Sequence, residues 1–163
     1  MAKTSRFKVH QQLLSIGDDY WIENEEGQKV YKIDGKALRI RKTLILEDAE
    51  GKPLCKIQER MLRIKDTMEI EDADGKRIAL VQKALLTPFR DRWVVKIRSG
   101  PDFVVQGNLL DHEYAIKHGI KRVAEISKKW FKLSDTYGVE VDDDQDEFVI
   151  LTVAIAIDMM VHD

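Results

Sequence analysis

A short acidic stretch ending in glycine recurs in this sequence. Residues 70–78 read Ile-Glu-Asp-Ala-Asp-Gly-Lys-Arg-Ile, residues 46–54 read Leu-Glu-Asp-Ala-Glu-Gly-Lys-Pro-Leu, and residues 22–30 read Ile-Glu-Asn-Glu-Glu-Gly-Gln-Lys-Val. The glycines of the three copies are 24 residues apart, which is the mark of an internal repeat. A stretch of this kind is either a calcium loop or a turn, and its flanking residues decide between them.

The flanking residues predict a β-hairpin in each copy. The apolar positions before each glycine keep the 24-residue spacing and differ by even numbers within a unit, so they share one face of an extended strand. A second apolar run follows each glycine, at residues 30–33, 54–57 and 78–81. Asp, Asn and Gly favour tight turns, whereas Lys76 and Arg77 stand where a calcium loop needs oxygen ligands. Each unit is therefore predicted to be a strand, a turn and a strand.

Two degraded units follow the three clear ones. The fourth has an alternating run at residues 93–97, a turn at 99–102 and a return at 103–105. The fifth is predicted to run from residue 123 to residue 133, turn at residues 135–138 and return at 139–141. Repeated hairpins with one apolar face form a sandwich or a closed barrel, because an open meander leaves two edges exposed.

The C-terminal part of the chain predicts a helix. Residues 142–147 carry five carboxylates, and residues 148–157 are an almost entirely apolar run. Acidic residues before an apolar run are typical of a helix N-terminus, so we expect a helix from about residue 144 to residue 162; the β-branched content would also permit a buried strand. A helix that is apolar on all sides must be enclosed, and the run is too short for a bilayer. We therefore predict a mainly β (α+β) fold, in which a closed antiparallel barrel is threaded by its own C-terminal helix.

Composition limits the classes of function. The 163 residues predict one domain, residues 1–163, and the near balance of 27 Lys and Arg against 29 Asp and Glu argues against nucleic acid as a partner. The single cysteine, Cys55, lies in an apolar segment and is expected to be buried. Residues 1–9 lack the apolar core of a signal peptide, so we expect a cytoplasmic protein. We also expect a monomer, and the sequence does not indicate a protein partner.

Motifs for catalysis are absent from the sequence. It has no His-x-x-x-His spacing, no nucleophile elbow and no phosphate-binding glycine loop. Residues 111–113, Asp-His-Glu, are interpreted as a solvated loop. We therefore predict neither an enzyme nor a cofactor.

Several segments together resemble a known family. They are residues 107–116 with Gly119, residues 123–131 with their Ser-Lys-Lys-Trp-Phe, residues 135–141 with their Asp-Thr-Tyr-Gly-Val, and the apolar tail closing on Ile157 and Asp158. The whole chain resembles the LURP-one-related family of the Tubby C-terminal-like superfamily, to which the phospholipid scramblases also belong. The resemblance implies a barrel of about twelve antiparallel strands around a central hydrophobic helix. It also implies relatives that include phosphoinositide-binding transcription regulators and proposed lipid scramblases.

Basic residues are the candidate ligand-binding groups. They occupy the polar faces of successive predicted strands: Arg39, Arg41, Arg63, Lys65, Arg90, Arg92, Lys96 and Arg98. Like charges on neighbouring strands destabilise the sheet unless an anion or interleaved carboxylates compensate them. The carboxylates expected to do so are Glu47, Glu69 and Glu71. The alternatives are thus a solvated exterior of mixed charge and a patch for anionic phospholipid or phosphoinositide headgroups.

A second basic set and an acidic run are further candidates. The basic set comprises Lys117, Lys121, Arg122, Lys128, Lys129 and Lys132, beside Trp130, which we expect in the core. The acidic run supplies the candidate metal ligands Asp142, Asp143, Asp144 and Asp146, with helix capping as the competing role. The leading hypothesis is a non-enzymatic binding or scaffold module that engages anionic lipid headgroups at the inner face of the membrane. The alternatives are a scramblase-like membrane protein, whose last helix enters lipid, and a transcription-associated regulator.

Overall fold

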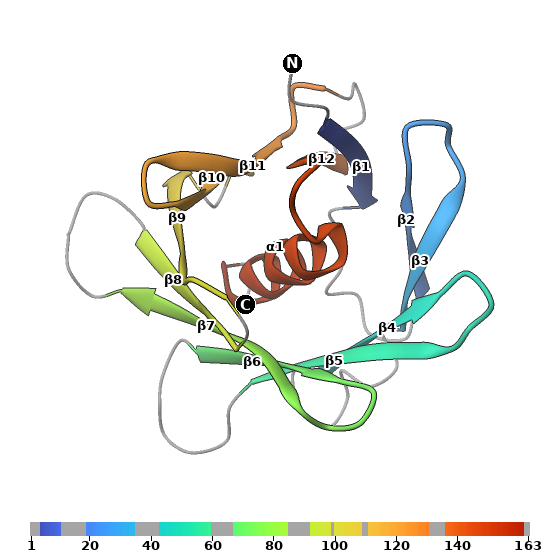
Figure 1. Ribbon diagram of the computed structural model, residues 1–163. Helices are drawn as coiled ribbons and strands as arrows, with labels where there is room; N and C mark the ends of the chain where they lie inside the picture. The colour runs from blue at the N-terminus through green and yellow to red at the C-terminus, as the bar shows by residue number, and fades with distance from the viewer. Residues whose placement is uncertain are drawn as a thin grey trace.

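The structure, a computed structural model, is a closed antiparallel β-barrel that surrounds one helix (Figure 1). It describes residues 4–10, 19–34, 43–59, 67–84, 92–98, 100–108, 111–130 and 136–161. The elements are β1 (Thr4–His10), β2 (Asp19–Glu23), β3 (Lys29–Asp34), β4 (Thr43–Asp48), β5 (Pro53–Glu59), β6 (Thr67–Asp72), β7 (Arg77–Ala84), β8 (Arg92–Ile97), β9 (Phe103–Asn108), β10 (Glu113–His118), β11 (Lys121–Ser127), β12 (Thr136–Asp142) and α1 (Glu147–Val161). The predicted barrel of about twelve strands around a C-terminal helix is confirmed.

Each strand pairs with its neighbours in the chain, and β1 closes the barrel against β12. Because successive strands are antiparallel, the chain changes ends at every connection. We call one end the turn end; the chain reverses there in residues 24–28, 49–52, 73–76, 98–102, 119–120 and 143–146. The strands are joined at the connection end by residues 11–18, 35–42, 60–66, 85–91, 109–112 and 128–135.

The three repeated acidic stretches are turns, as predicted. In each, the side-chain oxygen of Asn24, Asp48 or Asp72 accepts hydrogen bonds of 2.9–3.1 Å from the backbone amides two and four residues later. The glycines have φ of +79°, +85° and +81°, which glycine adopts without a steric penalty. One side-chain oxygen in each stretch is therefore bonded to the backbone of its own turn.

The fifth predicted hairpin is wrong in its turn. Thr136 to Gly138 lie in β12 and pair with β1, where His10 faces Thr136. Tyr137 is completely buried, so tertiary pairing overrides the turn propensity of this segment. The hairpin at this side of the barrel is instead formed by β10 and β11, around Gly119 at φ +62°.

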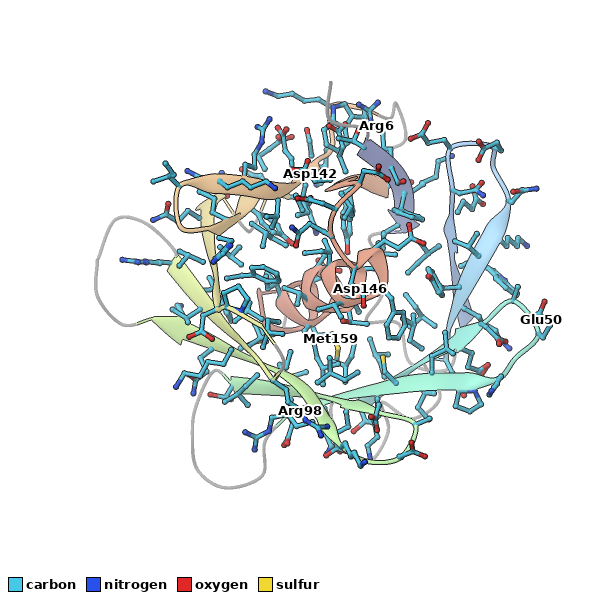
Figure 2. All side chains as sticks on the ribbon, in the orientation of Figure 1. Arg6, Glu50, Arg98, Asp142, Asp146 and Met159 are labelled. Carbon is cyan, nitrogen blue, oxygen red and sulfur yellow. The ribbon has the colours of Figure 1, made fainter. Side chains whose placement is uncertain are left out.

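Helix α1 is enclosed on all sides by the barrel. Every residue from 150 to 157 is at most 1% exposed, and Figure 2 shows Met159 also on the helix inside the barrel. Inward residues of the strands complete the core, among them Ile22, Leu44, Ile57 and Ile70. The Thr152 hydroxyl donates to the Val149 carbonyl at 2.8 Å, so this buried polar group is satisfied. The helix interpretation is confirmed, and the strand alternative for residues 148–157 is wrong.

Gly107 is required by the close approach of β9 and β10. Its φ is +139°, and an added Cβ would lie 2.6 Å from the Glu113 carbonyl oxygen and 2.7 Å from the Tyr114 Cα. A side chain at this position would therefore push the two strands apart.

Candidate functional site

Two of the eight predicted basic residues lie on one strand, and a third follows it directly. Arg92 and Lys96 are on the outer face of β8, and Arg98 follows directly; all three are exposed. The register places Arg92 opposite Gln106, and Lys96 opposite Leu80. These cations form no ion pair with any residue that the structure describes. Arg98 is labelled in Figure 2, on the opposite side of the barrel from β1.

The other five lie outside the described residues. Arg39 and Arg41 fall between β3 and β4, Arg63 and Lys65 between β5 and β6, and Arg90 between β7 and β8. All three pairs of strands are joined at the connection end, where Arg92 also begins β8. Arg92 therefore lies at the opposite end of β8 from Lys96 and Arg98, which lie toward the turn end.

Carboxylates on the outer face are paired with other bases than those predicted. Glu69 accepts from Arg77 at 2.9 Å, and a Glu71 oxygen lies 3.7 Å from the Lys56 nitrogen. Glu47 faces Lys32 across β3 and β4. The outer face of the described strands β3 to β7 thus carries mixed charge. None of the eight predicted basic residues lies on these strands, so the choice between the two alternatives stays open.

The second basic set is also partly neutralised. Lys121 donates to Asp144, and Arg122 lies 3.1 Å from a Glu125 oxygen. Lys132 lies outside the described residues.

Trp130 is half-buried and lies outside the core, contrary to expectation. The Arg6 guanidinium lies 4.4 Å from the centre of its ring. The same guanidinium donates to Glu140 at 2.6 Å. Trp130 therefore covers the outside of the β1–β12 closure as a platform for Arg6.

The acidic run caps the helix. Asp146 accepts hydrogen bonds from the amides of Phe148 at 3.0 Å and Val149 at 3.3 Å, the geometry of an N-cap. Asp144 pairs with Lys121, which lowers the pKa of that carboxyl. Figure 2 shows Asp146 at the start of α1, and Asp142 apart from it, at the end of β12.

The metal hypothesis gains no support from this arrangement. Across the described ranges, no three His, Cys, Asp or Glu side chains are grouped to hold a metal ion. For Asp142, Asp143, Asp144 and Asp146, the metal role stays an untested prediction.

A buried polar pair joins α1 to the segment directly before β10, and sequence reasoning missed it. His112 Nε2 lies 2.6 Å from Asp158 Oδ1, and both side chains are 1% exposed. The Tyr137 ring stacks on the imidazole with 4.3 Å between ring centres. Asp111 and Glu113 do not join this pair: Asp111 accepts a hydrogen bond from the Asn108 side chain, and Glu113 accepts one from the Ser127 hydroxyl. The interpretation of residues 111–113 as a solvated loop is therefore wrong for His112.

Burial dominates the electrostatics of the interior. It raises the pKa of Tyr114 and Tyr137 well above the usual range, and the Asp158 charge raises both further. Burial also raises the pKa of the Cys55 thiol to about 12. Cys55 is 2% exposed, so the prediction of a buried cysteine is confirmed.

Comparisons with known proteins agree with this architecture. A family model described as LURP-one-related matches residues 5–158. The X-ray structure of a protein from Arabidopsis thaliana is similar, with a TM-score of 0.65 and 14% sequence identity over 95% of this chain and 90% of that chain. The curated proteins contain no match. At this identity the structural likeness shows the fold alone.

Proposed function

This chain belongs to the LURP-one-related family, and from that premise we propose that it is a non-enzymatic binding module that docks on anionic phospholipid surfaces through the connection end of its barrel. The supporting observation is the opposite balance of charged residues in the sequence segments that follow the strands at the two ends. The six segments that join strands at the connection end hold eleven Lys or Arg and five Asp or Glu. The six segments at the turn end, counted in the same way, hold three Lys or Arg and eight Asp or Glu.

Such a distribution orients a protein at a membrane. The inner leaflet carries a negative surface potential, and each Lys or Arg near it contributes about 1 kcal/mol. The acidic turn end is repelled by the same surface, so the barrel would stand with its connection end toward the lipid. Arg39, Arg41, Arg63, Lys65 and Arg90 belong to this proposed surface together with Arg92. Lys96 and Arg98 do not, because they lie toward the turn end.

Vesicle co-sedimentation tests the proposal. Vesicles of phosphatidylcholine with phosphatidylserine or a phosphoinositide are compared with pure phosphatidylcholine, at low and high salt. We expect binding only to the anionic vesicles, and weaker binding at high salt. Replacing Arg39, Arg41 and Arg63 by Gln should release the protein from the vesicles.

A matched variant at the turn end controls for net charge. Lys52, Lys76 and Arg98 are exposed there, and their replacement by Gln should leave binding unchanged. Equal loss in both variants, or no binding by the wild type, would refute the proposal.

The scramblase-like alternative places α1 in lipid. No helix in the described part of the chain is long and apolar enough to cross a bilayer. The helix would also have to leave a barrel that buries residues 150–157 completely. Labelling of those residues by a lipid-phase reagent would favour this alternative over surface docking.

A further inference from the structure

Strand β1 extends past its neighbour at the closure of the barrel. It pairs with β12 along its whole length, from Thr4 to His10. It pairs with β2 only at Lys8 and Val9, which face Glu23 and Ile22. The first four residues of β1 therefore have a strand on one side only, and this half-strand points toward the turn end.

A side chain occupies the place of the missing strand. Glu25, in the turn after β2, accepts a hydrogen bond of 2.9 Å from the Arg6 backbone amide. Backbone groups of alternate residues point the same way along a strand, so Thr4 presents its amide and carbonyl on this side as well. A strand of four residues is about 13 Å long, the span of a short extended peptide.

Two hollows flank this edge, one of about 480 Å³ and one of about 490 Å³. Thr4, Arg6, Asn24 and Glu25 line both. The apolar lining of the first comes from three residues around the start of α1, namely Phe7, Val30 and Tyr31. The half-strand thus lies between spaces that can take the alternate side chains of an added strand.

The charge of the hollows selects the occupant. Their acidic residues are Glu23, Glu25, Glu26, Glu140 and Glu147, against Arg6 and Lys8 as the basic ones. Arg6 is paired with Glu140, and Lys8 lies 3.7 Å from Glu23. Glu25, Glu26 and Glu147 form no ion pair with the described residues. Three carboxylates therefore remain for cations from outside.

We infer that the edge of β1 at Thr4 to Phe7 is a docking site for an extended peptide segment of a partner protein that carries lysine or arginine. The peptide adds as a strand beside β1, and its backbone replaces Glu25 at the Arg6 amide. Strand addition supplies main-chain hydrogen bonds, while alternate side chains supply specificity. The released Glu25, together with Glu26 and Glu147, pairs with the basic side chains of the peptide.

Fluorescence anisotropy with a labelled Thr-Lys-Val-Lys-Val-Thr peptide tests the inference on the full chain. We expect saturable, salt-sensitive binding, with amide shifts in the NMR spectrum at Thr4 to Phe7 and in the turn at residues 24–28. Replacing both lysines by glutamate should abolish binding, because the site is acidic. Replacing the first valine by proline should also abolish it, because proline cannot donate a hydrogen bond to a strand.

The 24-residue repeat offers a matched control for the carboxylates. Glu50 and Asp74 occupy the positions of Glu26 in the next two turns, and all three are exposed. The variant E26Q/E147Q should weaken binding about tenfold or more, a change of about 1.4 kcal/mol. The variant E50Q/D74N removes the same charge and should bind as the wild type does.

Three results would overturn the inference. The first is equal weakening of binding in E26Q/E147Q and E50Q/D74N, and the second is binding of the proline peptide as tight as that of the lysine peptide. The third is displacement of the lysine peptide by spermine at equal charge concentration, which would indicate a simple cation site. Concentration-dependent self-association that E26Q/E147Q abolishes would identify a second copy as the occupant, and this too would refute a partner peptide. Circular dichroism of each variant verifies that the barrel is folded.

Discussion

The central helix has an aspartate near each end, and the two occupy opposite environments. Asp146 is exposed and caps the first turn of α1 through two backbone amides. Asp158 is buried in the last turn and is held by His112, which directly precedes β10. Water can replace the partners of Asp146 when that residue is changed, whereas the groups around Asp158 have no access to solvent. Burial, more than residue type, therefore sets how much a polar side chain contributes to stability.

The largest expected effect is at the buried end. Asp158→Ala removes one partner of a buried pair and leaves His112 without this carboxylate, which typically costs about 3–5 kcal/mol. The free energy of unfolding from urea denaturation measures the loss.

A double-mutant cycle sharpens this test. The variant D158L/H112F replaces both partners by apolar groups and should be more stable than the sum of the single losses predicts. Additive losses would show that the pair is not coupled. A loss for Asp158→Ala no greater than that for Asp146→Ala would show that burial does not distinguish the two ends of the helix.

The next largest loss of stability is expected in β9, the strand that precedes His112. Gly107→Ala places a methyl group 2.6 Å from the Glu113 carbonyl oxygen in a backbone conformation that favours glycine. We expect a loss of about 1–3 kcal/mol from strain, measured as a lower unfolding midpoint. Gly100→Ala is the control, because its Cβ would meet only Ile97 Cγ2, at 3.7 Å.

A smaller effect is expected at the exposed end. Asp146→Ala removes the N-cap and should cost about 1 kcal/mol. Asp146→Asn keeps a capping oxygen and should cost less. A loss as large as that of Asp158→Ala would contradict the proposed role of solvent.

Alkaline pH extends the comparison to the barrel wall. The Cys55 pKa is raised from 9.0 to about 12 by burial, so the unfolded chain ionises first as the pH rises. The contribution of the protonated thiol to the free energy of unfolding is therefore complete below about pH 9. It is lost progressively between pH 9 and pH 12, and the loss reaches about 1 kcal/mol at pH 10. The free energy of unfolding of Cys55→Ala should fall less steeply over this range than that of the wild type, and equal slopes would contradict the assignment.

The smallest effect is expected from the exposed ion pair next to the cap. Lys121→Gln should leave the unfolding midpoint unchanged, because both partners are solvated. It should nevertheless raise the pKa of the Asp144 carboxyl, which Lys121 holds down. A pH titration followed by NMR measures this shift, and an unchanged pKa would exclude the contact.

Local patterns predicted most of the fold. The turns at Gly27, Gly51 and Gly75 and the enclosure of α1 follow from spacing and periodicity within a few residues. The β10–β11 hairpin was missed because its turn, around Gly119, lacks the acidic repeat.

The buried pair depends on information that the local sequence does not contain. His112 and Asp158 are 46 residues apart, and polar neighbours made His112 resemble a solvated residue. One signal did point to it. An aspartate in a helix that is enclosed on all sides needs a buried partner, and Asp158 interrupts the apolar run of α1.

The enclosure of α1 also constrains the order in which the protein forms. The helix follows all twelve strands in the chain, so the ribosome makes the wall of the barrel before the element that fills it. Strand β1 also cannot complete its pairing until β12 has been made, because Thr4 pairs with Asp142. Long-range pairing of this kind slows folding. During synthesis the inward faces of eleven or more strands are therefore open to water, and we expect newly made chains to depend on chaperones until α1 arrives.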